Sequence, residues 1–209
     1  DQLSGHVDEL AKAYGYTHKE MIDELTYRYD GYHFTWPSPD IFNPYSLLYA
    51  LGKLQLGSYW FGSGTPTFLI EMLRKFNVAP SQIGGVTLRS SAFDAPAERL
   101  SSITPLLYQS GYLTIKEGDV KLNLFTLDIP NTEIRIGLMS SLLPNYVNQM
   151  ADMGETTVAL MYQKIRDGQI DEALKLLQKY LLTVPYCRDA NTEGHYQQML
   201  YVIFSLMGY

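Results

Sequence analysis

The sequence predicts a mainly α-helical protein of the α+β class with a small β content. Apolar residues recur every three or four positions along most of the chain, which is the spacing of amphipathic helices. One stretch, residues 112–129, instead reads as two short β-strands. Because only helical patterns follow residue 130, we expect two domains, 1–129 with the strands and 130–209 as a helical bundle or connector.

Composition is typical of a soluble globular protein. The 209 residues are 46% hydrophobic and 18% charged, and a chain of this size can bury a core. A net charge of −6 argues against a nucleic-acid platform over the whole chain but leaves a local basic groove open. The single cysteine, Cys187, excludes an internal disulfide and a cysteine metal cluster. No apolar run could span a membrane and no signal peptide opens the chain, so we expect a cytoplasmic protein without a membrane partner.

Two helices are expected before residue 31. Residues 3–13 carry an apolar stripe at helical spacing, made of Leu3, Val7, Leu10 and Ala11. The next helix begins after Thr17, with Glu20 at the capping-box position, and ends at Asp30-Gly31, where glycine allows a positive φ.

The aromatic stretch "YRYDGYHFTWPSPDIFNPYSLL", residues 27–48, follows. We expect a short strand or extended turn, ended by Pro37 and Pro39, and a new helix starting at Asn43-Pro44. Its rings are expected to fill a core, chiefly those of Tyr32, Phe34 and Trp36. The alternative is an exposed carbohydrate- or peptide-binding face formed by Tyr27–Trp36 with Tyr59–Phe61.

Helical and strand signals alternate between residues 64 and 129. Thr65-Pro66 predicts a helix start, with an inward face made of Phe68, Leu69, Met72, Leu73 and Phe76. Residues 78–97 read as a loop. A short helix then ends at Gly111, and strands at 112–115 and 120–129 are joined by a turn at "KEGD". A helix followed by such a hairpin is winged-helix-like.

The remaining chain reads as helices. Asn131 or Thr132 is expected to cap the first, and Pro144 to kink or break it. An antiparallel pair surrounds Asp167-Gly168, with a stripe at Leu174, Leu177 and Leu181. The inward face of the last helix is expected to contain Tyr196, Met199, Leu200, Ile203, Phe204 and Met207.

Residue chemistry alone predicts no active site. The phosphate loop of P-loop NTPases is absent, and "FGSGTP" could serve as an anion site or only as a tight helix start. The four histidines, expected at the surface or its boundary, lack the spacing of a helical metal site; they are His6, His18, His33 and His195. No nucleophile elbow occurs.

Five blocks together carry a family resemblance: "YRYDGYHF", "IFNPYSLLYAL", "YWFGSGTPTFLIEML", "LLYQSGYLTI" and "LDIPNTEIRIG". In this order and spacing the chain resembles the middle of bacterial proteins, abundant in Bacteroidetes, with an AAA-ATPase-like front and a PD-(D/E)XK nuclease-like end. In that family, Walker motifs precede the first block. The metal-binding Asp and Glu-x-Lys follow a helix like "EGHYQQMLYVIFSLMGY".

The resemblance implies a middle fragment of such a protein. Residues 1–129 would be the C-terminal lid of the ATPase with its winged-helix-like hairpin. Residues 130–209 would be a helical connector and the first helix of the nuclease-like domain. The missing ATPase core and nuclease-like domain would be its partners in cis. ATP and Mg²⁺ are implied for the parent protein only, and no cofactor is expected in this chain.

One residue is a candidate for catalysis. Glu193 is the position that could match the acid which assists the metal site from the first helix of many such nucleases. It could instead cap that helix, where a negative charge meets the helix dipole. No other catalytic residue and no cofactor-binding or metal-binding residue is expected.

Three functions follow as alternatives. The first is a non-catalytic fragment of an ATPase/nuclease-like protein, mediating interdomain coupling or partner contact. The second is a winged-helix-type nucleic-acid-binding module, although residues 98–129 carry three basic against four acidic residues. The third is an aromatic-rich carbohydrate- or peptide-recognition protein.

Overall fold

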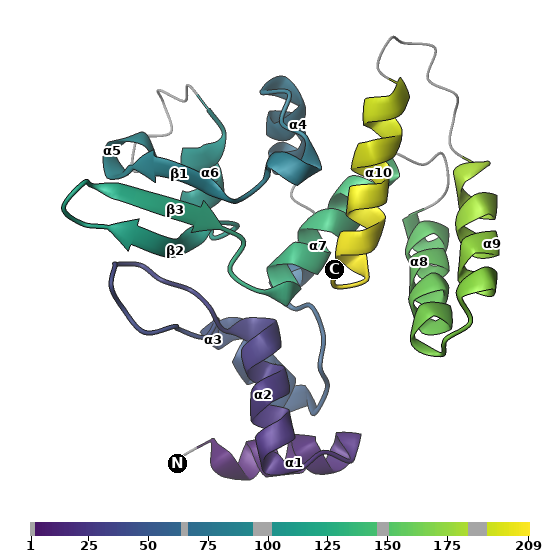
Figure 1. Ribbon diagram of the computed structural model, residues 1–209. Helices are drawn as coiled ribbons and strands as arrows, with labels where there is room; N and C mark the ends of the chain where they lie inside the picture. The colour runs from purple at the N-terminus through teal and green to yellow at the C-terminus, as the bar shows by residue number, and fades with distance from the viewer. Residues whose placement is uncertain (1–2, 64–66, 94–101, 146–150, 184–191) are drawn as a thin grey trace. The chain divides into compact units, whose positions relative to one another are not determined.

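The computed structural model describes residues 3–63, 67–93, 102–145, 151–183 and 192–209 (Figure 1). It confirms the expected class, because helices dominate and the strands form one small antiparallel sheet. The chain divides into two compact units, residues 1–78 with 82–137 and residues 79–81 with 138–209. This division lies inside a helix, at Gly137, whereas the sequence led us to expect it after residue 129.

The elements follow one another along the chain as labelled in Figure 1. The first unit contains α1 (Ser4–Tyr14), α2 (His18–Tyr29), α3 (Pro44–Lys53), η1 (Trp60–Ser63), α4 (Thr67–Lys75), β1 (Val86–Arg89), α5 (Ser90–Phe93), α6 (Thr104–Gln109), β2 (Thr114–Asp119) and β3 (Leu124–Asp128). The short η2 (Pro80–Gln82) and the helix α7 (Thr132–Leu142) contain residues of both units. The second unit contains η4 (Leu143–Asn145), α8 (Ala151–Arg166), α9 (Ile170–Leu181) and α10 (Thr192–Leu206).

The first three helices pack around one apolar core. Its buried members are Val7, Leu10, Ala11, Met21, Leu25, Tyr29, Ala50 and Leu51. The capping box is confirmed: Glu20 N–H donates to Thr17 Oγ1 at 3.2 Å, and Thr17 N–H donates to Glu20 Oε2 at 2.7 Å. Asn43 caps α3, since its Oδ1 accepts from the backbone N–H of Tyr45 at 3.1 Å. Local capping chemistry therefore sets both helix starts.

The aromatic stretch forms an extended turn whose two ends meet in an antiparallel bridge between Tyr32 and Ile41. Tyr32 is buried, as expected, but Phe34 is 69% exposed and Trp36 is partly exposed. The expectation that Phe34 fills a core was wrong. Its ring stacks on the ring of Tyr32, with centroids 6.3 Å apart, and faces solvent beyond it.

The sheet has the strand order β1-β3-β2, all antiparallel. The helix and hairpin between Thr104 and Asp128 are confirmed, but β1 lies where a loop was expected. The hairpin turn also comes later, at residues 120–123, while "KEGD" belongs to β2. The physical reason is the Asp119 side chain, whose Oδ1 accepts from the N–H groups of Lys121 and Leu122, with Asn123 at φ +53°.

The face of α4 is only partly as expected. Leu69 and Leu73 are buried, whereas Phe68 is 60% exposed, so its assignment to the inward face was wrong. Leu69, Leu73 and Phe76 recur four and three residues apart on one side, and Phe68 lies about 100° round the helix from Leu69. The expected start at Thr65-Pro66 lies outside the described residues.

After residue 130 the described part of the chain is helical, as expected. Asn131 Oδ1 accepts from Ile134 N–H at 3.1 Å, which confirms the cap of α7, and Pro144 lies in the 3-10 turn that follows this helix. Helices α8 and α9 form an antiparallel pair around Gly168, at φ +73° (Figure 1). Met199 and Ile203 of α10 are fully buried.

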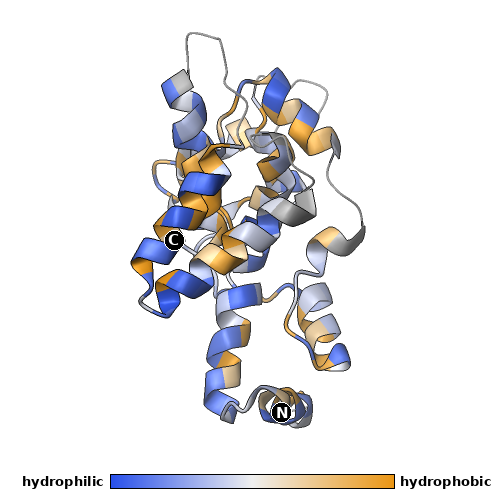
Figure 2. Ribbon diagram, turned by 90° about the vertical axis from the view of Figure 1, so that its right-hand side faces the viewer, coloured by the Kyte–Doolittle hydropathy of each residue, from blue (hydrophilic) through white to orange (hydrophobic). Residues whose placement is uncertain are grey.

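In α9 the buried residues are Ala173 and Tyr180, while Leu174 of the expected stripe is 56% exposed. Figure 2 looks onto the side where α9 lies in Figure 1 and shows hydrophobic segments alternating with hydrophilic ones along it. The expected inward face of α10 needs correction, because Phe204 is 41% exposed and the buried face instead includes Val202. Several neighbouring apolar residues of α10 allow more than one face to be chosen from the sequence.

A glycine in α7 tests the packing of the first unit. A Cβ at Gly137 would collide with the ring of Phe61, whereas a Cβ at Gly52 in α3 meets no atom within 4 Å. Gly137→Ala is therefore expected to lower the free energy of unfolding by about 1–3 kcal/mol. The matched control Gly52→Ala should raise it by about 0.5–1 kcal/mol. Urea unfolding measures both, and equal effects would contradict the packing described.

Candidate functional site: a polar clamp around Lys116

The catalytic candidate from the sequence, Glu193, has no metal-ligating group around it among the described residues. Glu193 lies in the first turn of α10, where its charge is favourable to the helix dipole, and is exposed. Among the described residues, no group of three or more His, Cys, Asp and Glu side chains could hold a metal ion. Cys187 and residues 64–66 of "FGSGTP" lie outside the described residues.

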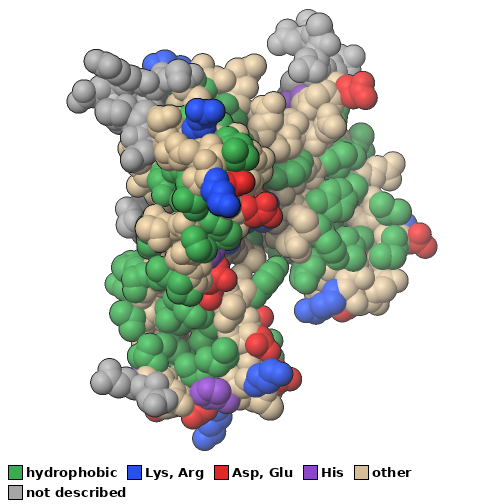
Figure 3. Space-filling view, turned by 60° about the vertical axis from the view of Figure 1, so that its left-hand side comes forward, with side chains coloured by type: hydrophobic (Ala, Val, Ile, Leu, Met, Phe, Trp, Pro, Cys, Tyr) green, Lys and Arg blue, Asp and Glu red, His purple; other side chains and the backbone are tan. Residues whose placement is uncertain are grey.

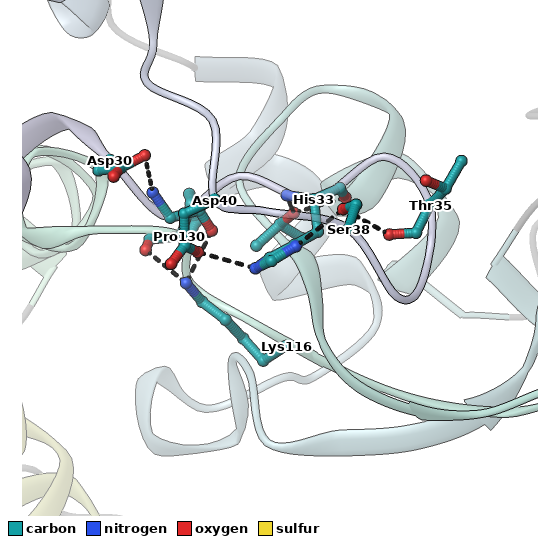
Figure 4. Close-up of polar contacts among 9 residues, drawn as sticks. Asp30, His33, Thr35, Ser38, Asp40, Lys116 and Pro130 are labelled. Atoms are coloured by element: carbon teal, nitrogen blue, oxygen red, sulfur yellow. Dashed lines mark hydrogen bonds and ion pairs between the residues drawn. The ribbon is translucent and has the colours of Figure 1, made fainter.

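The structure instead gathers polar groups around Lys116 of β2 (Figure 4). The Lys116 Nζ donates to the carbonyl oxygens of Gly31, at 2.7 Å, and Pro130, at 2.8 Å. Gly31 follows α2 and Pro130 precedes α7, so one ammonium group joins three segments. We call Gly31, Lys116 and Pro130 the Lys116 clamp.

The charge of Lys116 is half-buried. Burial lowers the pKa of its ammonium group, and the surrounding carboxylates oppose that shift; they are Asp40, Asp128 and Asp30. Two charge-assisted hydrogen bonds compensate for lost hydration. This is a structural arrangement for a lysine, since its Nζ donates hydrogen bonds to two backbone carbonyls.

Glycine is required at position 31. Its φ is +101°, in the region that favours glycine, and a Cβ there would collide with the Pro130 carbonyl oxygen and approach Lys116 Nζ to 2.7 Å. Asp30 Oδ1 accepts from the Gly31 N–H at 2.9 Å and so fixes the turn. The Asp-Gly pair thus ends α2 and admits the lysine.

The neighbouring tyrosines anchor the same stretch. Tyr29 Oη donates to the Gly57 carbonyl at 2.8 Å and accepts from the Gly57 N–H at 3.0 Å. Tyr32 Oη donates to the Gly111 carbonyl at 3.1 Å. Burial raises the pKa of Tyr29 to about 12 and raises that of Tyr32 further. The two tyrosine hydroxyls therefore hold distant backbone segments in place by hydrogen bonds.

His33 holds the turn that follows. Its side chain is buried, with Nδ1 at 3.0 Å from Ser38 Oγ and Nε2 at 2.8 Å from Asp40 Oδ1 (Figure 4). The His33 backbone is fixed as well, since its N–H donates to Thr114 Oγ1 and its carbonyl accepts from the same hydroxyl. The expectation of a surface or boundary histidine was therefore wrong.

Ser38, His33 and Asp40 are the residue types of a hydrolase triad, but their hydrogen bonding differs from one. Ser38 Oγ donates its one hydrogen to the Thr35 carbonyl oxygen, which lies 2.9 Å from Oγ. In a triad that hydrogen goes to the histidine, which acts as the base. All three side chains come from one short turn, which they close by local bonds.

A second polar hub is the buried carboxylate of Glu133 in α7. Its Oε1 accepts from Ser46 Oγ at 2.9 Å, Tyr59 N–H at 2.6 Å and Trp60 N–H at 3.0 Å. Three donors satisfy Oε1, whereas Oε2 is buried and has no hydrogen-bond partner among the described residues. Glu133 therefore ties α3 and η1 to the start of α7.

Comparison with known proteins gives one informative match. The chain is 30% identical over 198 residues to a protein of Azotobacter chroococcum mcd 1 described as "Uncharacterized protein in vnfD 5'region". The match covers 89% of this chain but 37% of that protein, so the chain spans little more than a third of its relative. No family model and no solved structure matches. None of the helices in the described part of the chain is long and apolar enough to cross a membrane.

Lys116 can be tested against an exposed lysine of the same hairpin. Lys116→Met removes both hydrogen bonds of the Lys116 clamp and leaves the carbonyls of Gly31 and Pro130 without a donor. The free energy of unfolding should therefore fall by about 1–3 kcal/mol. Lys121→Met, in the exposed turn after β2, should change it by less than about 0.5 kcal/mol. Chemical unfolding provides the measurement, and a clamp variant as stable as the Lys121 control would be inconsistent with this role.

The raised pKa of Tyr29 predicts that the free energy of unfolding depends on pH in the alkaline range. Its pKa is about 12 in the folded protein, against about 10 for an unperturbed tyrosine. The unfolded chain thus loses the proton first. The contribution of Tyr29 to stability is complete below about pH 10 and falls as pH rises towards 12. Urea unfolding from pH 9 to 11.5 should show a smaller alkaline loss in Tyr29→Phe than in the wild type. The control Tyr27→Phe, at an exposed position, should keep the wild-type slope.

Proposed function

We propose that this chain is a non-catalytic middle part of an AAA-ATPase-like protein with a nuclease-like end, and that it provides interdomain coupling or partner contact. The family resemblance of the five sequence blocks supports this. So does the relative of Azotobacter chroococcum, most of whose length lies outside the match.

The observation that carries the proposal is the exposed face of α3. A helix that is apolar all round is normally buried. In α3 the sole charged residue is Lys53, and yet Leu48 is 56%, Tyr45 43% and Tyr49 42% exposed. Hydrophobic side chains gather at the lower left of Figure 3, in the part of the molecule formed by the first three helices and the turn between α2 and α3. Such a patch marks a contact surface for another protein part.

The polar clamp fits the same role. The Lys116 clamp and Glu133 connect the end of α2, α3, the hairpin and the start of α7 by bonds from charged side chains. These bonds connect segments that lie far apart in the sequence, and this supports a role in coupling.

The nucleic-acid alternative has weaker support. Of the three cations between residues 98 and 129, Arg99 lies outside the described residues and Lys116 is engaged by two carbonyls. Lys121 remains exposed in the hairpin turn, which also presents Val120 and Leu122 at 61% exposure each. Helix α6, "TPLLYQ", carries no charge. A DNA-contacting surface would need several cations here.

One observation supports the alternative of a carbohydrate- or peptide-recognition protein. Tyr45, Tyr49 and Tyr59 form a row, with ring centroids 4.6 and 5.6 Å apart, and Lys53 Nζ lies 5.1 Å from the centroid of the Tyr49 ring. Rings in a row on an exposed face can stack on sugars or peptides. This row lies on the same exposed face of α3, so two variants separate the two functions. Tyr49→Ala removes a ring and should weaken both ligand stacking and apolar docking. Leu48→Asp should weaken apolar docking alone.

The first test concerns catalysis. The chain alone should show no ATP hydrolysis and no Mg²⁺-dependent DNA cleavage above a mock-purified control, since the Walker motifs and the Asp…Glu-x-Lys set are absent from its sequence. Turnover that follows the protein through purification would contradict the proposal. Fluorescence anisotropy with duplex and single-stranded DNA at low salt tests the nucleic-acid alternative, which salt-sensitive micromolar binding would support.

The flanking coding sequence tests the parent protein. We expect a Walker A motif before residue 1 and Asp…Glu-x-Lys after residue 209, whereas stop codons at both edges would overturn the proposal. If the flanking domains are then produced as separate proteins, the Leu48→Asp variant of this chain should no longer bind them. The control Leu122→Asp, at the similarly exposed hairpin tip, should leave that binding unchanged.

A further inference from the structure

The hydrogen atoms of the turn between α2 and α3 determine which form of the His33 ring fits there. Ser38 Oγ has one hydrogen, which it donates to the Thr35 carbonyl oxygen. The same Oγ lies 3.0 Å from His33 Nδ1. Because the hydroxyl has no second hydrogen, it accepts in this contact. His33 Nδ1 is therefore the donor and carries a hydrogen.

The other ring nitrogen of His33 needs a hydrogen as well. His33 Nε2 lies 2.8 Å from Asp40 Oδ1, and an ionised carboxylate only accepts hydrogen bonds. A neutral imidazole has one N–H group, whereas an imidazolium has two. The bonds to Ser38 and Asp40 are therefore made together only when His33 is charged.

The surroundings of the turn can balance this charge. Lys116 of β2 is the cation beside the turn, and three carboxylates act on it; they are Asp40 of the turn, Asp128 of β3 and Asp30 at the end of α2 (Figure 4). An imidazolium at His33 adds a second cation, so three carboxylates balance two positive charges. Tyr32 stays neutral in the range in which histidines titrate, because burial raises its pKa. The side chain of His33 is 9% exposed, so its acceptors in the protein take the place of water.

The backbone of His33 is held independently of the ring. Its N–H donates to Thr114 Oγ1 at 2.8 Å, and its carbonyl accepts from that hydroxyl at 2.9 Å. The ring bonds instead reach Ser38 and Asp40, further along the turn. A change in the ring therefore acts on residues 35–40, while residue 33 stays attached to β2.

We propose that His33 makes the turn between α2 and α3 a pH-sensitive latch, closed when the ring is an imidazolium and loosened when Nδ1 loses its proton to solvent. Without that proton, the Thr35 carbonyl and Nδ1 are two acceptors for the one hydrogen of Ser38, and one of the two bonds is lost. The bond from Nε2 to Asp40 remains. Histidines change charge between about pH 5 and 8, so the turn is closed at the acidic end of this range. The latch does not rest on the proposed role of α3.

Trp36 provides a fluorescence test of the latch. The ring centroids of His33 and Trp36 lie 5.2 Å apart, in an edge-on arrangement. An imidazolium quenches the fluorescence of a neighbouring indole more strongly than a neutral imidazole does. The emission of the wild type should therefore rise in one step between about pH 5 and about pH 8. His33→Gln should abolish this step. The matched control His18→Gln, at an exposed histidine that also contacts a carboxylate, should keep it. Far-UV circular dichroism checks that both variants remain helical.

The ring nitrogens give an independent readout on the wild-type chain. In 15N–1H NMR of the histidine rings, both nitrogens of His33 should carry a proton near about pH 5, and Nε2 alone near about pH 8. The backbone signals of Thr35 and Ser38 should shift together with the ring. A His33 ring that keeps one form over this range, or backbone signals that do not follow it, would overturn the proposal. A fluorescence step that survives His33→Gln would overturn it as well.

Discussion

The packing of the first unit depends on the hydrogen bonds that the ammonium group of Lys116 donates. The group is half-buried, and its two acceptors, the carbonyls of Gly31 and Pro130, belong to segments far apart in the sequence. Glycine at position 31 allows this approach, since its φ is positive and any side chain would meet the Pro130 carbonyl. A lysine and a glycine thus fix where the end of α2, the hairpin and the start of α7 meet. The aromatic stretch around Gly31 belongs to this junction.

A carboxylate of opposite sign completes the junction. Glu133 accepts three hydrogen bonds from α3 and η1, just as Lys116 donates to two carbonyls. Hydrogen bonds to Lys116 Nζ and to Glu133 Oε1 offset the cost of burying these groups, whereas the buried Glu133 Oε2 has no hydrogen-bond partner among the described residues. Tyr29 and Tyr32 add hydroxyl bonds to backbone groups from the same region. These groups hold distant backbone segments together by hydrogen bonds.

Local signals in the sequence predicted the helix boundaries well. Thr17 with Glu20, Asp30-Gly31 and Asn43-Pro44 act within a few residues, so their geometry is readable from the chain. β1 was missed because four residues give too short an alternation, and Phe34 and Phe68 were misplaced because hydrophobicity does not identify which ring faces inward. The site could not be predicted. Lys116 and Gly31 are 85 residues apart, and Glu133 and Ser46 are 87, so only the folded chain reveals these pairs.

The central claim is that the stretch around Gly31 is a structural junction that links distant segments. Native-state hydrogen exchange of the wild type and Lys116→Met tests it most directly. The account predicts that exchange speeds up together at three places: Tyr32 and His33 after α2, Ile115 in β2, and Ile134 and Arg135 at the start of α7. Faster exchange confined to β2, with the ends of α2 and α7 protected as in the wild type, would contradict it.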